Sequence, residues 1–295
     1  MYYLLSLLAG VLISVMVAFN GRLTEQYGVY PATIIIHIAG LLLITIMTIS
    51  KRENPFSKRQ AWFLYLGGAI GVMTTVFNNL SFSRISVSSL LALGLLGQSL
   101  TGLIIDQYGL LNMPKHIFQK KKIFGLILIL CGIVSMTDNF DLLAVVVSFL
   151  AGITIVVSRT LNAKLAECTS IRISTFFNYL IGLLVSIPVF FIFGGNETAF
   201  ADFTFSPNIY IYFGGIFGVC IVLLSNITVT KISAFYLSLF MFIGQVFSGI
   251  LVDVVLSQAF SPRNMIGGVF VTAGLCVNLL LDRKFGNAET EIIKS

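Results

Sequence analysis

Ten apolar runs divide this chain, and most of them are long enough to cross a membrane as a helix, which needs roughly 20 residues. In lipid, backbone N–H and C=O groups must bond within the segment, so such runs favour helices. The composition agrees, because 57% of the 295 residues are hydrophobic and only 10% are charged, too few to cover a water-soluble domain. The runs lie at about residues 3–24, 29–50, 61–80, 86–106, 122–137, 142–163, 172–193, 209–230, 232–254 and 264–281. The sequence therefore predicts an all-α membrane protein with ten transmembrane helices.

The two halves of the chain repeat one another. Ser6-Leu7-Leu8-Ala9-Gly10 matches Ser148-Phe149-Leu150-Ala151-Gly152 in the first helix of each half. Further matches follow in the same order: Asn20 with Asn162, Arg22 with Lys164, Glu25 with Glu167, Gly40 with Gly182, Gly71 with Gly218, Asn79 with Asn226, and Gly125 with Gly267. Self-similarity in the same order along the chain indicates a repeated structural unit. We expect two units of five helices each, residues 1–138 and 139–295.

An odd number of helices in each unit makes the second unit enter the membrane in the opposite direction. If the N-terminus is cytoplasmic, three basic residues, Arg22, Arg84 and Arg263, lie on the outer side. Fourteen lie on the cytoplasmic side: Lys51, Arg52, Lys58, Arg59, Lys115, Lys120, Lys121, Lys122, Lys164, Arg172, Lys231, Arg283, Lys284 and Lys294. This bias predicts cytoplasmic N- and C-termini. Inverted repeats that meet about an axis in the membrane plane are typical of alternating-access transporters, with the binding site where they meet.

One motif, G-Q-x-x-x-G-x-x-x-D, occurs in both units. It places Gln98 and Asp106 in the fourth helix and Gln245 and Asp253 in the ninth. Residues four apart share a helix face, so each motif predicts a buried polar seam. The glutamines lie mid-span, where they either contact a substrate or bond a neighbouring helix. The aspartates lie nearer the two membrane faces, where a gate or a helix-end bond is expected and proton coupling is the alternative.

Arg159 has no basic counterpart, because the repeat pairs it with Val17. Near the inner end of its helix, its side chain could extend to the lipid headgroups. The alternative is a bond to an anionic substrate group or to Asp106. We keep Arg159 as a candidate binding residue.

Two further pairs complete the candidate substrate-binding residues. Asn20 and Asn162 each stand two residues before a basic residue near a helix end, where a membrane anchor is the first interpretation. His37 is paired with Tyr179 in the second helix of each unit. A lone intramembrane histidine is more often a hydrogen-bonded packing residue than a proton relay.

These features resemble the YdcZ family of inner-membrane exporters, within the drug/metabolite transporter superfamily. The resemblance lies in the opening A-G-x₉-N-x-[RK]-L pattern, the glycine-rich third helix, and the G-Q-x-x-x-G-x-x-x-D helix followed by Tyr108-Gly109-Leu110. It implies the fused ten-helix form, a transport role and peripheral fifth and tenth helices, but no particular ligand. The second copy departs from the pattern, because Val254-Val255-Leu256 follows Asp253.

We therefore expect a secondary transporter in the inner or plasma membrane, with a central cavity formed by helices one to four and six to nine. Without a G-x-x-x-x-G-K-[ST] motif, no nucleotide-driven step is predicted. We expect no cofactor, metal or nucleic acid. The expected partners are a small-molecule substrate and the lipid bilayer, with a homodimer as an option. The alternatives are a non-transporting structural or regulatory membrane protein and, less favoured, an intramembrane enzyme.

Overall fold

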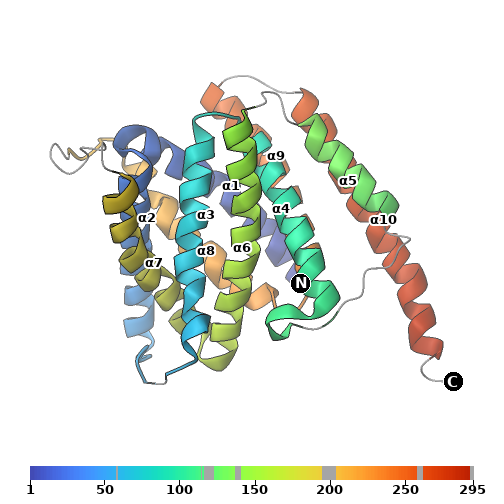
Figure 1. Ribbon diagram of the computed structural model, residues 1–295, viewed down its shortest axis with the longest axis horizontal. Helices are drawn as coiled ribbons and strands as arrows, with labels where there is room; N and C mark the ends of the chain where they lie inside the picture. The colour runs from blue at the N-terminus through green and yellow to red at the C-terminus, as the bar shows by residue number, and fades with distance from the viewer. Residues whose placement is uncertain are drawn as a thin grey trace.

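In the computed structural model of this chain, the residues that are described form ten α-helices and three short 3₁₀ helices (Figure 1). The structure describes residues 1–57, 59–113, 115, 123–136, 141–194, 204–257 and 262–292. The α-helices are α1 (Tyr2–Tyr27), α2 (Val29–Ser50), α3 (Leu66–Phe82), α4 (Val87–Tyr108), α5 (Ile123–Ser135), α6 (Leu142–Cys168), α7 (Ile171–Phe193), α8 (Gly214–Thr228), α9 (Ala234–Ser257) and α10 (Pro262–Ile292). The 3₁₀ helices are η1 (Trp62–Tyr65), η2 (Leu110–Asn112) and η4 (Ile209–Phe213). Each predicted range overlaps one α-helix.

Capping residues determine where several helices begin. Ser86 and Ser170 precede α4 and α7, and each accepts a hydrogen bond from the backbone N–H three residues further on. Asp141 does the same at the start of α6. Gly109 ends α4 with a φ of 63°, a left-handed conformation that glycine adopts without strain. These local signals explain why the observed helices begin and end near the predicted residues.

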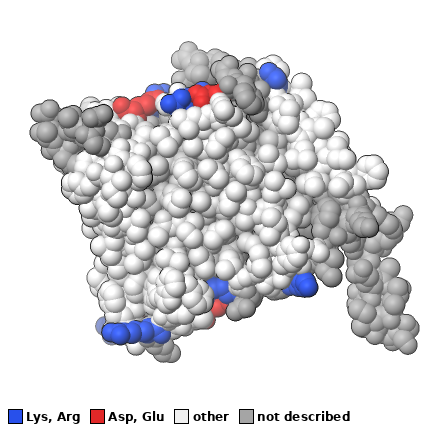
Figure 2. Space-filling view, in the orientation of Figure 1, with Lys and Arg blue, Asp and Glu red and all other residues white. Residues whose placement is uncertain are grey.

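Eight of these segments are long and apolar enough to cross a membrane, among the residues that the structure describes. They are α1, α2, η1 with α3, α4, α6, α7, η4 with α8, and α9. The expectation of ten spans is therefore met for these eight; α5 has only 13 residues, and α10 continues beyond the predicted run to Ile292. Figure 2 shows Lys, Arg, Asp and Glu at two opposite edges, with a broad uncharged band between them. The protein is a multi-pass membrane protein.

The contacts between helices follow the sequence repeat. α1 packs on α8 and α9, and its counterpart α6 packs on α3 and α4. Likewise α2 contacts α8, and its counterpart α7 contacts α3. Three further contacts each join a helix to its own counterpart: α2 with α7, α4 with α9 and α5 with α10. Exchanging the first five helices for the last five leaves this set of contacts unchanged. The α5–α10 pair lies at one edge of the molecule (Figure 1), as expected.

Two glycines allow the closest of these approaches. A Cβ on Gly10 of α1 would lie 1.9 Å from the carbonyl oxygen of Met241 in α9. A Cβ on its counterpart Gly152 would lie 2.0 Å from the carbonyl oxygen of Gly94 in α4. Small residues let membrane helices pack backbone against backbone, where van der Waals contact replaces the hydrophobic effect as the driving force.

Candidate functional site

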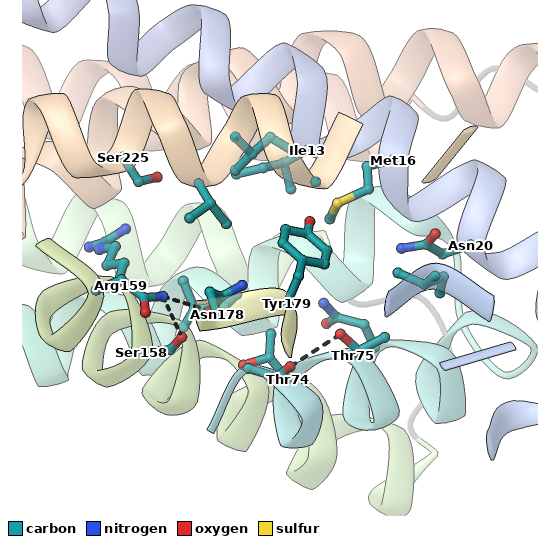
Figure 3. A pocket seen from close by; sticks show the side chains of 18 of the residues that line it. Ile13, Met16, Asn20, Thr74, Thr75, Ser158, Arg159, Asn178, Tyr179 and Ser225 are labelled. Carbon is teal, nitrogen blue, oxygen red and sulfur yellow. Dashed lines mark hydrogen bonds between the residues drawn. The ribbon is translucent and has the colours of Figure 1, made fainter. Parts of the chain in front are cut away.

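A cavity of about 160 Å³ lies among six helices of the bundle (Figure 3). Residues of α1, α2, α3, α6, α7 and α8 line it, and Met241 of α9 completes the lining. The lining residues are Ile13, Met16, Val17, Asn20, Ile36, His37, Gly71, Thr74, Thr75, Asn78, Asn79, Ile155, Ser158, Arg159, Asn162, Asn178, Tyr179, Gly218, Ile221, Val222, Ser225, Asn226 and Met241. We expected helices one to four and six to nine to form the cavity, but α4 contributes none of the lining residues.

The lining consists of repeat pairs. Every lining residue except Met241 has its repeat counterpart on the lining as well. Helices α1, α2 and α8, which contact one another, supply one member of each pair, and we call their lining residues the α1 wall. Helices α6, α7 and α3, which also contact one another, supply the other members, the α6 wall. The cavity therefore lies where the two halves of the chain meet.

The two walls differ in chemistry. Five pairs join a polar residue to an apolar one, and in all five the polar residue belongs to the α6 wall. These pairs are Ser158 with Met16, Arg159 with Val17, Asn178 with Ile36, Thr74 with Ile221, and Thr75 with Val222. Figure 3 shows Thr74, Ser158 and Asn178 on one side of the cavity, and Ile13 and Met16 on the other. The contacts are thus nearly symmetric, whereas the polarity of the lining is not.

Arg159 is buried, with only 6% of its surface exposed. Its Nη1 donates to Gln98 Oε1 at 3.4 Å and to the weakly accepting Sδ of Met241 at 3.5 Å, and its Nη2 donates to the carbonyl oxygen of Ala234 at 3.2 Å and to Ser238 Oγ. The interpretation of Arg159 as a headgroup anchor is wrong, because an anchoring guanidinium would be exposed at the membrane surface. The α4 and α9 contacts instead hold the guanidinium at the cavity.

The remaining Arg159 donor, Nε, has no hydrogen-bond partner among the described residues. Asp106 interacts with the guanidinium electrostatically, but both of its carboxylate oxygens also accept backbone hydrogen bonds from the start of α9. The lining residues, all within the described part of the chain, include no Asp or Glu. Arg159 is therefore the one charged residue on the lining, and the carboxylate of Asp106 is its counter-charge behind the wall.

Asn162 is the centre of a small amide cluster beside Arg159. Its Nδ2 donates to Asn178 Oδ1 at 2.7 Å and to Ser158 Oγ at 3.4 Å, and Ser158 Oγ in turn donates to the carbonyl oxygen of Gly67 at 2.7 Å. A Cβ on Gly67 would lie 2.3 Å from Asn162 Oδ1, so the glycine leaves room for the amide. The asparagine is thus a buried wall residue, and not a surface anchor.

Asn20 occupies the equivalent place on the α1 wall. A Cβ on Gly214 would lie 1.8 Å from Asn20 Oδ1, which repeats the relationship between Gly67 and Asn162. The Oδ1 atom has no hydrogen-bond partner among the described residues. Both asparagines therefore line the cavity, as proposed for substrate-binding residues, although only Asn162 belongs to an amide cluster.

His37 and Tyr179 face each other across the α2–α7 contact. Their ring centroids are 5.9 Å apart, and each ring packs where the other helix has a glycine, His37 on Gly182 and Tyr179 on Gly40. The His37 Nδ1 lies 2.7 Å from the carbonyl oxygen of Thr33. This geometry agrees with a hydrogen-bonded packing role, while both rings still contribute to the cavity lining.

Gln98 and Gln245 do not line the cavity, so the ligand contact that was one of the two interpretations is not seen there. Both are buried, with 3% and 1% of their surface exposed. Gln98 accepts the Arg159 hydrogen bond described above, whereas Gln245 Oε1 has no partner in the described part of the chain. Gln98 thus lies one contact behind the wall, where it positions Arg159. We see no equivalent role for Gln245.

Asp106 and Asp253 both bind helix starts. Asp106 accepts hydrogen bonds of 3.0 Å from the backbone N–H groups of Ala234 and Phe235, the first two residues of α9. Such carboxylates satisfy the unpaired N–H groups of the first helical turn. This is the helix-end bond that the sequence predicted as one alternative for Asp106.

Asp253 forms the mirror contact at the other end of the α4–α9 pair. It accepts hydrogen bonds from the backbone N–H groups of Val87 at 3.1 Å and Ser88 at 3.2 Å, the first two residues of α4, and from the Ser88 hydroxyl. The two carboxylates therefore lie at opposite ends of the pair and away from the cavity lining.

Two charged contacts lie outside the membrane-spanning helices. Glu53, after α2, accepts hydrogen bonds from Ser170 and Arg172 at the start of α7. Partial burial raises the pKa of Glu53, but these bonds outweigh it and leave the pKa below its ordinary value. Asp141 has a lowered pKa because the backbone N–H of Ala144 and the Arg84 guanidinium, 2.9 Å away, both stabilise its charged form.

Sequence reasoning missed Asn178, Ser158 and Thr74 as wall residues. The signal that could have found them is the one that marked Arg159, namely a polar residue whose repeat counterpart is apolar. No group of three His, Cys, Asp or Glu residues in the described ranges could hold a metal ion. The cavity can therefore bind a small molecule through hydrogen bonds, through the positive charge of Arg159 and through apolar contacts.

Comparisons with known proteins agree with this architecture. A search of curated proteins finds no match, whereas 28 chains of solved structures match. One of them, described only as "Crystal structure of protein", is similar over 96% of this chain and 98% of that chain, with a TM-score of 0.72 and 14% identity, which shows a shared fold alone. The model of the family described as "Putative inner membrane exporter, YdcZ" matches residues 1–135 and again residues 143–277. Because the model covers nearly the whole chain as two segments, the protein belongs to the YdcZ family of inner-membrane exporters.

Proposed function

We propose that this membrane transporter exports a small metabolite or drug-like compound by alternating access, with residues 1–138 and 139–295 as inverted repeats around the cavity. The observation that carries the proposal is that the lining consists of repeat pairs. In repeat-built transporters the site lies between the repeats, and their relative movement exposes it to one side and then to the other. The excess of basic residues on one side supports cytoplasmic termini.

In this cycle the capping aspartates hold the two mouths of the bundle closed in turn. Asp106 and Asp253 bind opposite ends of the α4–α9 pair, so releasing one contact loosens one mouth of the bundle while the other holds. In this proposal the energy comes from a gradient or from substrate exchange. A purely structural role would leave the buried Arg159 and the polar wall around it without a purpose, since buried polar groups are costly unless they are used.

Filling the cavity tests the proposal. A Cβ on Gly71 would lie 3.5 Å from Ser158 Oγ and 3.6 Å from Asn178 Oδ1, so Gly71→Ala fits and Gly71→Leu occupies the space between the walls. Screening a labelled metabolite library for uptake into proteoliposomes first identifies the transported compound. We expect Gly71→Leu to abolish uptake of that compound. Met73→Phe also places a large side chain on α3, but at an exposed position, and should leave uptake intact.

Full uptake by a folded Gly71→Leu protein would place the transport path elsewhere. Failure of every library compound to enter proteoliposomes faster than it enters protein-free liposomes would reject transport itself.

A further inference from the structure

The polarity of the cavity assigns a chemical class to its ligand. We propose that the cavity selects a small amphipathic organic anion, with its charged group against Arg159 and Asn178 on the α6 wall and its apolar body against the α1 wall. This inference rests on the proposed transport function and specifies what is carried.

The first argument is the direction of the repeat differences. Equivalent positions in the two halves make equivalent helix contacts, so the fold requires the same kind of residue at both. A departure at one lining position could be incidental. Here all five polar-to-apolar departures point the same way, with Ser158, Arg159 and Asn178 facing the counterparts Met16, Val17 and Ile36. A ligand that is polar on one side and apolar on the other explains why all five polar residues lie on the α6 wall. Helix packing alone does not explain this.

The second argument is the state of the Arg159 guanidinium. The α4 and α9 contacts fix its terminal nitrogens, and two of these contacts are long, at 3.4 and 3.5 Å. The Nε–H donates to nothing in the described part of the chain. A buried donor without an acceptor is unfavourable, and a carboxylate is the acceptor that best fits the edge of a guanidinium.

Neighbouring amides extend this donor edge. Asn178 uses its Oδ1 to accept from Asn162 at 2.7 Å, whereas its Nδ2 donates to no atom among the described residues. An amide nitrogen with its oxygen already bonded is held as a donor. Arg159 Nε and Asn178 Nδ2 therefore offer two donors on one wall, with no acidic residue on the lining to compete for them.

The opposite wall and the volume limit the body of the ligand. Six residues of the α1 wall present apolar surface to the ligand, while its polar members are Asn20, His37, Ser225 and Asn226; the apolar six are Ile13, Met16, Val17, Ile36, Ile221 and Val222. A dry apolar cavity of roughly 150 Å³ accepts a molecule the size of benzene, and this cavity measures about 160 Å³. A single ring or short alkyl chain bearing one carboxylate or a comparable anionic group fits both observations.

Four probes with a constant ring or a constant head separate these contributions. We suggest thermal unfolding of the full chain in lipid nanodiscs with phenylacetate, phenylacetamide, 2-phenylethylamine and acetate, because a ligand that binds the folded state raises its apparent stability. We expect phenylacetate to bind at least tenfold more tightly than the amide or the amine, and acetate to give no shift. Equal binding of the amine, equal binding of acetate, or no shift with any probe would overturn the assignment.

Two arginine variants then locate the effect. Arg159→Gln should weaken phenylacetate binding about ten- to a hundredfold, the usual contribution of a charge-assisted hydrogen bond. Arg22→Gln makes the same substitution at a partly exposed arginine outside the cavity lining and should keep the preference for the anion. If Arg159→Gln does not fold, Arg159→Lys, which keeps the charge, should retain that preference, and Asn178→Ile should reduce it. Unchanged preference in the folded Arg159→Gln and Asn178→Ile proteins contradicts the proposal.

The library screen keeps this inference distinct from the proposed function. Uptake of a neutral or cationic compound that Gly71→Leu blocks would uphold transport through the cavity and reject the anionic substrate class. Absence of uptake for every compound would reject transport.

Discussion

Asp106 and Asp253 each cap the helix that carries the other. Asp106, at the end of α4, binds the first two backbone N–H groups of α9, and Asp253, at the end of α9, binds the first two of α4. The four capped residues are repeat counterparts of one another. One motif that occurs twice in the sequence thus produces a reciprocal clamp at both ends of an antiparallel helix pair.

Removing a capping carboxylate should destabilise the α4–α9 pair. We expect Asp106→Ala and Asp253→Ala to lower the free energy of unfolding by about 0.5–2 kcal/mol, the usual effect of losing a helix cap. The larger loss should come from Asp106→Ala, because Asp106 is only 4% exposed and Asp253 is half-buried. The corresponding Asn variants keep one acceptor oxygen and should lose less. Denaturant unfolding in mixed micelles measures the free energy of unfolding of each variant. Ala variants as stable as wild type would show that these caps do not stabilise the helix pair.

The proposed inversion of the two repeats predicts that equivalent loops face opposite sides of the membrane. Ser57 follows α2, and Phe205 lies in the equivalent connection after α7. In a chain whose four native cysteines are replaced, Ser57→Cys should resist an impermeant thiol reagent added to intact cells, and Phe205→Cys should react. Equal reactivity of both, or the reverse order, would show that the halves are not inverted with cytoplasmic termini.

Backbone contact at Gly152 should make it intolerant of a methyl group. A Cβ there meets the Gly94 carbonyl oxygen at 2.0 Å, whereas a Cβ on Gly71 meets its nearest neighbour at 3.5 Å. We expect Gly152→Ala to lower stability by about 1–3 kcal/mol through overpacking and Gly71→Ala to stay near wild type. Melting temperatures of the two purified variants measure this, and similar values would mean that α4 and α6 can separate at little cost.

Acid should weaken the contact between Glu53 and the start of α7. The folded-state pKa of Glu53 lies below its ordinary value of 4.5, so its stabilising contribution is full above 4.5 and is lost as the pH falls through the lowered folded pKa. We expect Glu53→Gln to melt below wild type at pH 7 and to converge with it in acid. The contribution is modest because the Arg172 side chain is 36% exposed. A difference that stays constant with pH would assign the effect to packing.

The sequence predicted the helices well because hydrophobic runs and capping residues act locally. Ser86, Asp141 and Ser170 are followed directly by the helices that they cap. The number of spans is met for eight of the ten predicted runs, since a run such as α5 can be apolar and still be short.

The residues that line the cavity could be predicted only in part. Arg159 and Asn162 were found because the repeat or their polarity singled them out. Gln98 and Gln245 share that polarity, yet periodicity gives a helix face without saying which neighbour covers it. Gln98 therefore proved to lie behind Arg159. Asn178 was missed because the difference between this polar residue and its apolar counterpart Ile36 points to a binding site only once both are known to line one cavity.

Accessibility of one cavity residue from both sides tests the central claim most directly. Ser225 lines the cavity, whereas Ser99 is buried beside Gln98 and does not. In a chain without native cysteines, we expect an impermeant thiol reagent to label Ser225→Cys in both right-side-out and inside-out vesicles, and Ser99→Cys in neither. Labelling of Ser225→Cys from one side only, or from neither, would contradict alternating access through this cavity.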